Sequence, residues 1–167
     1  MSIISIRFVQ LTLLCSMLFI TSCKTVLAPE YDKAIVESVS VTSQKTMSFV
    51  ASVSNGVTQE TFKNREPIYN YLIGAFDALK LQARARPVPR NVATKQINKL
   101  LKIKGHTTVK DEYYPSAFAF QKIAETLTKM KDTDRSKGIK PFAVEAFKGQ
   151  IEIFLDQAIT YESFLKR

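Results

Sequence analysis

The chain has 167 residues, of which 46% are hydrophobic and 23% are charged. This composition is typical of a globular protein and excludes a collagen-like or largely disordered chain. The chain holds one histidine, two cysteines and no tryptophan, and its formal net charge is +9. Where the excess positive charge lies is therefore the first question that bears on function.

The first 22 residues have the organisation of an export signal. Arg7 precedes a nearly uncharged apolar run over residues 8–20, which is short for a stable membrane span. The sequence Ile20-Thr21-Ser22-Cys23 follows, and it resembles the lipobox of bacterial lipoproteins. The resemblance covers residues 1–23 and implies that residues 1–22 are a signal peptide, and that Cys23 carries fatty acyl chains once this peptide is removed. The alternatives are an ordinary signal peptide with an incidental cysteine, or an uncleaved anchor helix.

The lipobox resemblance also implies a location. In Gram-negative lipoproteins, an Asp directly after the lipidated cysteine resembles a signal for retention in the inner membrane. This chain has Lys24 at that position. We therefore expect an exported chain anchored to the outer membrane of a bacterial envelope and facing the periplasm. Cys15 would be discarded, so the mature chain would have no thiol for a disulfide, a metal or a nucleophile. Residues 23–28 form a short tether of less than about 20 Å, which keeps the domain close to the membrane.

Apolar residues three and four positions apart predict helices in the rest of the chain. We expect an all-α fold in which residues 29–167 form one domain, an antiparallel bundle of four long helices and one short helix. Pro29 begins the first helix and Asn55-Gly56 ends it, and the second helix ends at Pro87.

The second half of the predicted bundle begins with the short helix, over residues 91–105. The fourth helix begins at Pro115 and is followed by a polar loop at residues 132–138, and Pro141 begins the last helix. Gly74 and Gly149 fall inside helices, where they allow a close approach of two helices or a bend. The apolar stripes supply the predicted core: Ile35, Val39, Thr42, Thr46, Phe49, Val53, Tyr69, Leu72, Phe76, Leu79, Ala83, Phe120, Ile123, Leu127, Met130, Val144, Phe147, Ile151, Phe154, Ala158, Tyr161 and Leu165.

Basic residues are concentrated in residues 80–110, here called the basic window. It contains nine Lys or Arg residues and no Asp or Glu, whereas the rest of the mature chain is nearly balanced. Such a concentration creates a local positive field. The predicted binding site for an anionic partner consists of eight of these cations: Lys80, Arg84, Arg86, Arg90, Lys95, Lys99, Lys102 and Lys104.

Two interpretations of the basic window are open. The short helix carries lysines on one side and aliphatic residues on the other, so it is either a core-facing helix with a solvated outer side or a surface for anions. Those anions would be lipid phosphates, an acidic polysaccharide or an acidic protein. Arg84 and Arg86 lie near a helix end, where they either complement the helix dipole or bind carboxylate and phosphate groups.

The sequence lacks the usual motifs of catalysis. It contains no nucleotide-binding, serine-hydrolase or zinc-protease motif. His106 stands alone in a Gly-His-Thr-Thr turn, without the partners that a metal site or a general base needs. We predict no catalytic residue, metal or cofactor, and an exported chain argues against a nucleic-acid partner.

These observations predict a membrane-anchored periplasmic lipoprotein that acts as a non-catalytic adaptor. Its basic window would bind an anionic envelope component or an acidic protein. One alternative is a carrier of small apolar ligands with a pocket between helices. Another is an immunity-type lipoprotein that neutralises a toxin by surface complementarity. An enzyme would require His106 to approach two acidic residues in a cleft.

Overall fold

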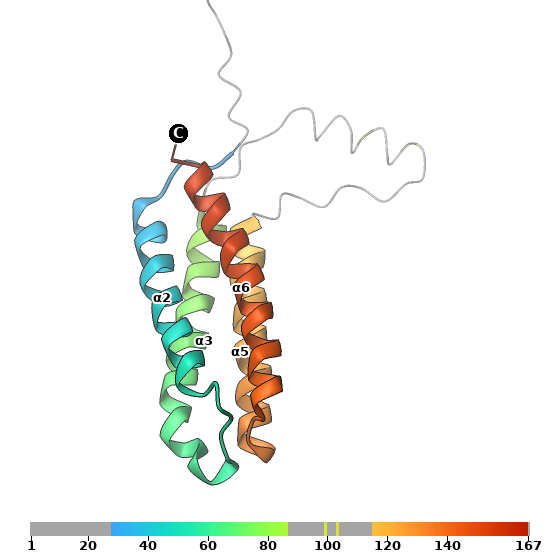
Figure 1. Ribbon diagram of the computed structural model, residues 1–167. Helices are drawn as coiled ribbons and strands as arrows, with labels where there is room; N and C mark the ends of the chain where they lie inside the picture. The colour runs from blue at the N-terminus through green and yellow to red at the C-terminus, as the bar shows by residue number, and fades with distance from the viewer. Residues whose placement is uncertain (1–27, 87–98, 100–102, 104–114, 167) are drawn as a thin grey trace, which may run out of the picture.

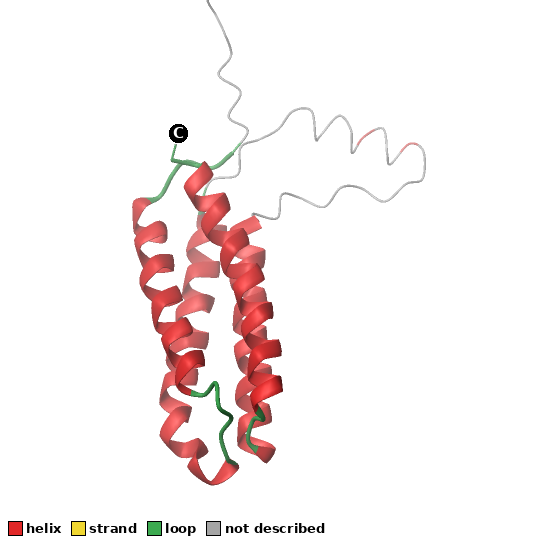
Figure 2. Cartoon of the chain, in the orientation of Figure 1, coloured by secondary structure: helices red, strands yellow, loops and turns green. Residues whose placement is uncertain are grey.

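The computed structural model describes residues 28–86, 99, 103 and 115–166, and the statements below concern these residues. They form an all-α bundle without strands in the described part of the chain (Figures 1 and 2). The predicted fold class is therefore confirmed. The elements are the helices α2 (Lys33–Ser52), α3 (Phe62–Ala85), α5 (Pro115–Lys137) and α6 (Pro141–Phe164), with the 3₁₀ turn η1 (Gln59–Thr61) before α3.

The four long helices run antiparallel to their sequence neighbours, so the bundle has two distinct ends (Figure 1). The terminal end holds the first turn of α2, the last turns of α3 and α6, and the first turn of α5. The loop end holds the connection from α2 to α3 and the connection from α5 to α6. Helix α5 packs most extensively against α3 and α6, whereas α2 makes smaller contacts with α3 and α6.

Each helix buries a stripe of residues that alternates spacings of three and four, the pattern of left-handed helix bundles. The α3 stripe runs through Tyr69, Phe76 and Ala83, and all three side chains are fully buried. The rings of Phe49 and Tyr69 meet edge to face with centroids 4.7 Å apart, which joins α2 to α3. The predicted inward positions of α2, α3 and α5 are confirmed as buried.

The α6 stripe differs in part from the prediction. Phe147, Phe154 and Tyr161 are only half-buried. The buried stripe instead passes through Leu155 and Glu162, one position further along the chain. The prediction selected the aromatic residues of this helix. It missed Glu162 because a stripe defined by apolar residues does not include a carboxylate.

Two helix boundaries also differ from the prediction. The first helix begins at Lys33 and not at Pro29, because Asp32 is its N-cap and accepts from the backbone nitrogens of Ala34 and Ile35. The predicted loop at residues 132–138 is wrong, since α5 continues to Lys137. An ion pair between buried Asp134 in this polar last turn and Arg65 on α3 holds the turn in helical form, as described below.

The connection from α5 to α6 is therefore very short, and a second loop fixes it. Backbone hydrogen bonds of 2.8 and 2.9 Å join Val57 and Ile139 in an antiparallel bridge. Gly56 and Gly138 flank this bridge with φ of +84° and +72°. Both positions require glycine, because a side chain there would be strained and would meet backbone or proline atoms of the opposite loop.

Several predicted segments lie outside the described residues: the signal peptide, Cys23, His106 and most of the short helix at residues 91–105. Lys99 and Ile103 belong to that predicted helix and are described, both helical and both exposed. Within the part of the chain that the structure describes, no helix is both long and apolar enough to span a bilayer.

The glycines inside the helices give a test of the packing. An added Cβ at Gly74 or Gly149 would meet no described atom within 4 Å, so the expectation that they allow close helix approach is wrong. Gly74→Ala and Gly149→Ala should each raise the free energy of unfolding by about 1 kcal/mol through helix propensity. Urea denaturation measures this, with Gly56→Ala and Gly138→Ala as destabilising controls. A loss of stability in Gly74→Ala or Gly149→Ala would contradict the packing described here.

Candidate functional site

The described residues of the basic window differ in how much charge they offer to a partner. Lys80 is half-buried, and its Nζ contacts Asp77 Oδ1 at 2.5 Å. Arg84 is exposed, and its Nη2 donates to Gln121 Oε1 at 3.2 Å. Lys99 is exposed. The other predicted cations lie outside the described residues: Arg90, Lys95, Lys102 and Lys104.

Arg86 serves the interior of the bundle. Its guanidinium binds Glu162 through two hydrogen bonds, from Nη2 to Oε1 at 2.6 Å and from Nη1 to Oε2 at 3.0 Å. Nη2 also reaches Ser116 Oγ at 3.3 Å. Arg86 is 9% exposed and Glu162 is 1% exposed, so this two-point ion pair is shielded from water. Arg86 joins the end of α3 to the start of α5 and the end of α6, and it does not present its charge at the surface.

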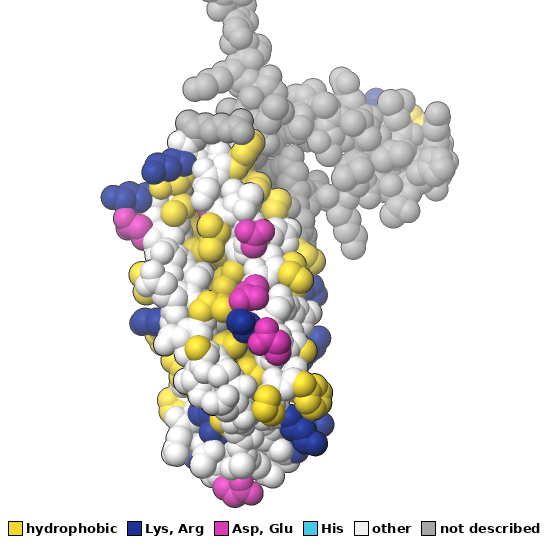
Figure 3. All heavy atoms as spheres, viewed as in Figure 1, with side chains coloured by type: hydrophobic (Ala, Val, Ile, Leu, Met, Phe, Trp, Pro, Cys, Tyr) yellow, Lys and Arg dark blue, Asp and Glu magenta, His cyan; other side chains and the backbone are white. Residues whose placement is uncertain are grey.

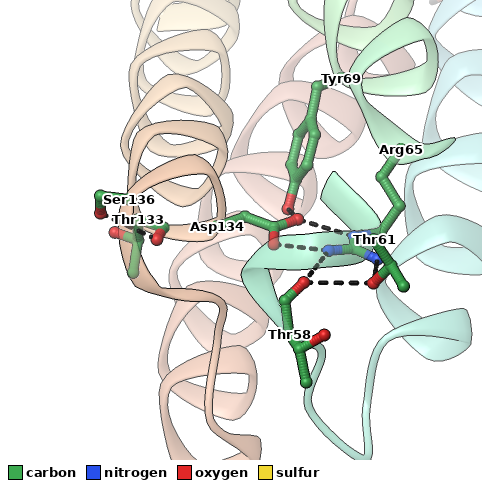
Figure 4. A network of polar contacts seen from close by, with 7 residues as sticks. All are labelled: Thr58, Thr61, Arg65, Tyr69, Thr133, Asp134 and Ser136. Atoms are coloured by element: carbon green, nitrogen blue, oxygen red, sulfur yellow. Dashed lines mark hydrogen bonds and ion pairs between the residues drawn. The ribbon is translucent and has the colours of Figure 1, made fainter. Parts of the chain in front are cut away.

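A second buried ion pair lies at the loop end (Figure 4). Arg65 on α3 donates from Nε and Nη2 to the two carboxylate oxygens of Asp134 on α5, both at 2.7 Å. Asp134 is fully buried. Arg65 also donates to the backbone oxygen of Thr58 and to the hydroxyl of Thr61. This network ties the last turn of α5 to α3 and to the loop before α3.

Tyr69 completes the loop-end network. Its hydroxyl donates to Asp134 Oδ2 at 3.3 Å. Burial raises the pKa of the Tyr69 phenol well above its ordinary value, and the neighbouring Asp134 carboxylate raises it further. The hydrogen bond to Asp134 likewise raises the pKa of Arg65. The phenol and guanidinium therefore keep their protons and act as fixed donors, which suits a structural role and not proton transfer.

Sequence reasoning missed both carboxylates of these pairs, although the spacing contained a signal. Asp134 follows Met130 by four residues, and Glu162 follows Ala158 by four. Each acid therefore continues the buried stripe of its helix into the last turns. Charged residues that continue an apolar stripe at a helix end indicate a buried pair, because an unpaired buried charge is too costly.

Two grooves flank α2, the helix with the smallest contacts. The α2–α3 groove is open and shallow, and Phe49, Ile68 and Tyr71 lie along it. The α2–α6 groove is more enclosed, with a volume of about 380 Å³. Figure 3 shows apolar side chains along the seam between α2 and α6 on the side facing the viewer.

Neither a metal site nor a known relative gives this chain a function. In the described part of the chain, no three His, Cys, Asp or Glu residues are grouped so that they could hold a metal ion. No protein-family model, no curated protein and no solved structure matches the sequence or the fold. Function must therefore be argued from the charge, the topology and the grooves of this chain.

The buried ion pair at the terminal end gives a direct test of its role. Glu162→Ala leaves Arg86 buried without its carboxylate partner, and it should lower the free energy of unfolding by about 3–5 kcal/mol. Glu145→Ala is the matched control, because its pair with Lys148 is exposed and contributes about 1 kcal/mol or less. Arg86→Met combined with Glu162→Leu should recover most of the loss. Chemical denaturation that shows equal costs for Glu162→Ala and Glu145→Ala would refute the assignment.

Proposed function

We propose that this chain is a lipid-anchored, non-enzymatic adaptor of a bacterial envelope, and that its basic connecting segment binds an anionic surface beside the membrane. Cys23 would carry the acyl chains, and the body would face the periplasm at the outer membrane. Two features support the proposal: the topology of the bundle and the distribution of charge.

The topology is the observation that carries the proposal. The first described residues lead into α2 at the terminal end of the bundle (Figure 1). At the same end, across the two ends of the connecting segment 87–114, Arg86 Nη2 donates to the hydroxyl oxygen of Ser116, the second residue of α5, at 3.3 Å. Cys23 precedes Ala28 by five residues, so the anchored cysteine would lie within about 20 Å of Ala28, the first described residue. The connecting segment therefore leaves and rejoins the bundle at the end nearest the anchor.

The charge balance points to the same segment. Residues 28–86 and 115–166 together hold 15 basic and 13 acidic residues, which is nearly neutral. Residues 87–114 hold six basic and two acidic residues. Lys80 and Arg86 contact carboxylates, so the proposal rests mainly on the cations that follow α3 in the sequence. Basic residues next to a membrane each contribute about 1 kcal/mol to binding an anionic leaflet.

A carrier of small apolar ligands is the second candidate. The α2–α6 groove favours it, because the walls of this groove are mainly apolar and partly enclosed. The two candidates involve different residues and different forces. Salt weakens the contact of exposed cations with an anionic surface, whereas it does not weaken the burial of an apolar ligand.

Charge reversal tests the adaptor proposal. In the mature chain with Cys23→Ser, which removes the anchor, Lys95→Glu, Lys99→Glu and Lys102→Glu together should lower affinity for phosphatidylglycerol vesicles. The expected loss is about a hundredfold or more, because three contributions of about 1 kcal/mol disappear. Vesicle co-sedimentation at low and high salt measures the effect. High salt should abolish most of the binding of the chain that lacks these three substitutions.

The matched control reverses three lysines elsewhere: Lys129, Lys137 and Lys140. These change the net charge by the same amount, but Lys137 and Lys140 lie at the loop end and Lys129 lies on the outer side of α5. Their reversal should weaken vesicle binding far less. Equal losses in both triple variants would show that only net charge matters, and the adaptor proposal would then fail.

A further inference from the structure

The α2–α6 groove combines a hollow with an unsatisfied polar group. The groove lies in the half of the bundle next to the terminal end, where the N-terminal half of α2 faces the C-terminal half of α6. Its lining residues are Val36, Val39, Ser40, Ser43, Gln44, Ile159, Glu162 and Ser163. Its volume of about 380 Å³ falls within the range of roughly 300–1,000 Å³ that is usual for small-molecule sites.

The hydroxyl of Ser43 has no hydrogen-bond partner among the described residues, although its oxygen is buried. Other buried hydroxyls of the bundle are satisfied; for example, Thr46 donates to the backbone oxygen of Thr42 at 2.8 Å. A buried polar atom without a partner costs free energy and calls for an explanation. Because the oxygen is closed to solvent in the free chain, a ligand group in the groove would supply the missing partner once the side chains around Ser43 shift slightly to admit it.

The chemistry of the lining restricts the class of ligand. Val36, Val39 and Ile159 supply aliphatic surface that suits a hydrocarbon chain, and the other five lining residues are polar. Among the described residues that line the groove, none is Lys or Arg, so an anionic head group would find no counter-charge. Arg86 already neutralises Glu162, so a cationic head group would compete with a buried ion pair. The head group that remains is neutral and capable of hydrogen bonding.

We infer that the α2–α6 groove binds one acyl chain with a neutral polar head, the chemistry of a monoacylglycerol. The chain lies between α2 and α6, and Ser43 donates its hydroxyl proton to the ester carbonyl oxygen. Ser40 and Ser163 line the same groove and suit the hydroxyl groups of the glycerol. The inference deepens the carrier candidate and stands apart from the binding of anions by the basic segment.

Binding of 1-decanoylglycerol, below the concentration at which it aggregates, tests this site. In the mature chain with Cys23→Ser, isothermal titration should show saturable binding of one molecule per chain. Decanoate, which has the same alkyl chain and an anionic head, should bind several-fold more weakly. No saturable binding of the glyceride, or tighter binding of decanoate, would overturn the inference.

Three substitutions on one helix separate the groove from general effects on α2. Ser43→Leu fills the groove and should weaken binding by about tenfold or more, a scale that a few methylene groups can produce. Ser48→Leu is the matched control in the α2–α3 groove and should leave affinity unchanged. Ser40→Trp blocks the groove from an exposed position, so it tests the site even if Ser43→Leu disturbs folding. Unchanged affinity in Ser40→Trp and Ser43→Leu would overturn the assignment.

Ser43→Ala gives a readout that a purely structural role would not produce. Because the hydroxyl is unsatisfied in the free chain, its removal should raise the thermal unfolding midpoint. The same change should weaken glyceride binding several-fold, because the hydrogen bond to the ligand is lost. The triple Lys-to-Glu variant of the basic segment should bind the glyceride normally, so failure of this site and failure of the adaptor proposal can be told apart. A Ser43→Ala variant with unchanged glyceride affinity would contradict the role given to the hydroxyl.

Discussion

The buried ion pair between Arg86 and Glu162 fixes the end of the molecule on which the functional proposals depend. It draws together the end of α3, the start of α5 and the end of α6, and Glu162 also faces α2 across the α2–α6 groove. The two hydrogen bonds of this pair fix the relative positions of the guanidinium and the carboxylate. Separating the two groups would leave an unpaired charge in the interior, which is strongly destabilising. The residues that flank the basic segment are therefore held at the end of the bundle where the described chain begins.

The two ion pairs also explain why α3, α5 and α6 are held together more firmly than α2 is held to them. Arg65 and Arg86 lie at opposite ends of the α3 stripe, and they bind acids on α5 and α6. In the described structure no ion pair joins α2 to another helix, and its polar link is Lys45 with Tyr71, through a hydrogen bond of 2.9 Å. Helix α2 therefore relies on apolar contacts, and grooves remain on both of its sides. The least constrained helix is thus the one beside which a ligand could be accommodated at the lowest cost in packing.

Most of the fold was predictable from spacing, because a stripe of apolar residues must be buried wherever it occurs in a helix. The failures with the largest consequences concern polar residues on those stripes. Residues 132–138 are polar enough to indicate a loop, yet Asp134 is buried against Arg65, a residue 69 positions earlier in the chain. The pairing of Glu162 with Arg86 spans 76 positions. Local patterns carry no information about such distant partners, so the ion pairs and the unsatisfied hydroxyl of Ser43 required the structure.

The most direct test of the account is the orientation of the chain on a membrane to which the proposed acyl anchor at Cys23 would hold it. Ala85→Cys places a thiol at the terminal end, and Gln59→Cys places one at the loop end; under the proposal that residues 1–22 are removed and Cys23 is acylated, no other free thiol is present. Helix α3 has 24 residues and spans about 36 Å, so fluorophores at the two sites should differ greatly in quenching by spin-labelled lipid head groups. The account predicts strong quenching at position 85 and little at position 59. Equal quenching, or stronger quenching at position 59, would contradict it.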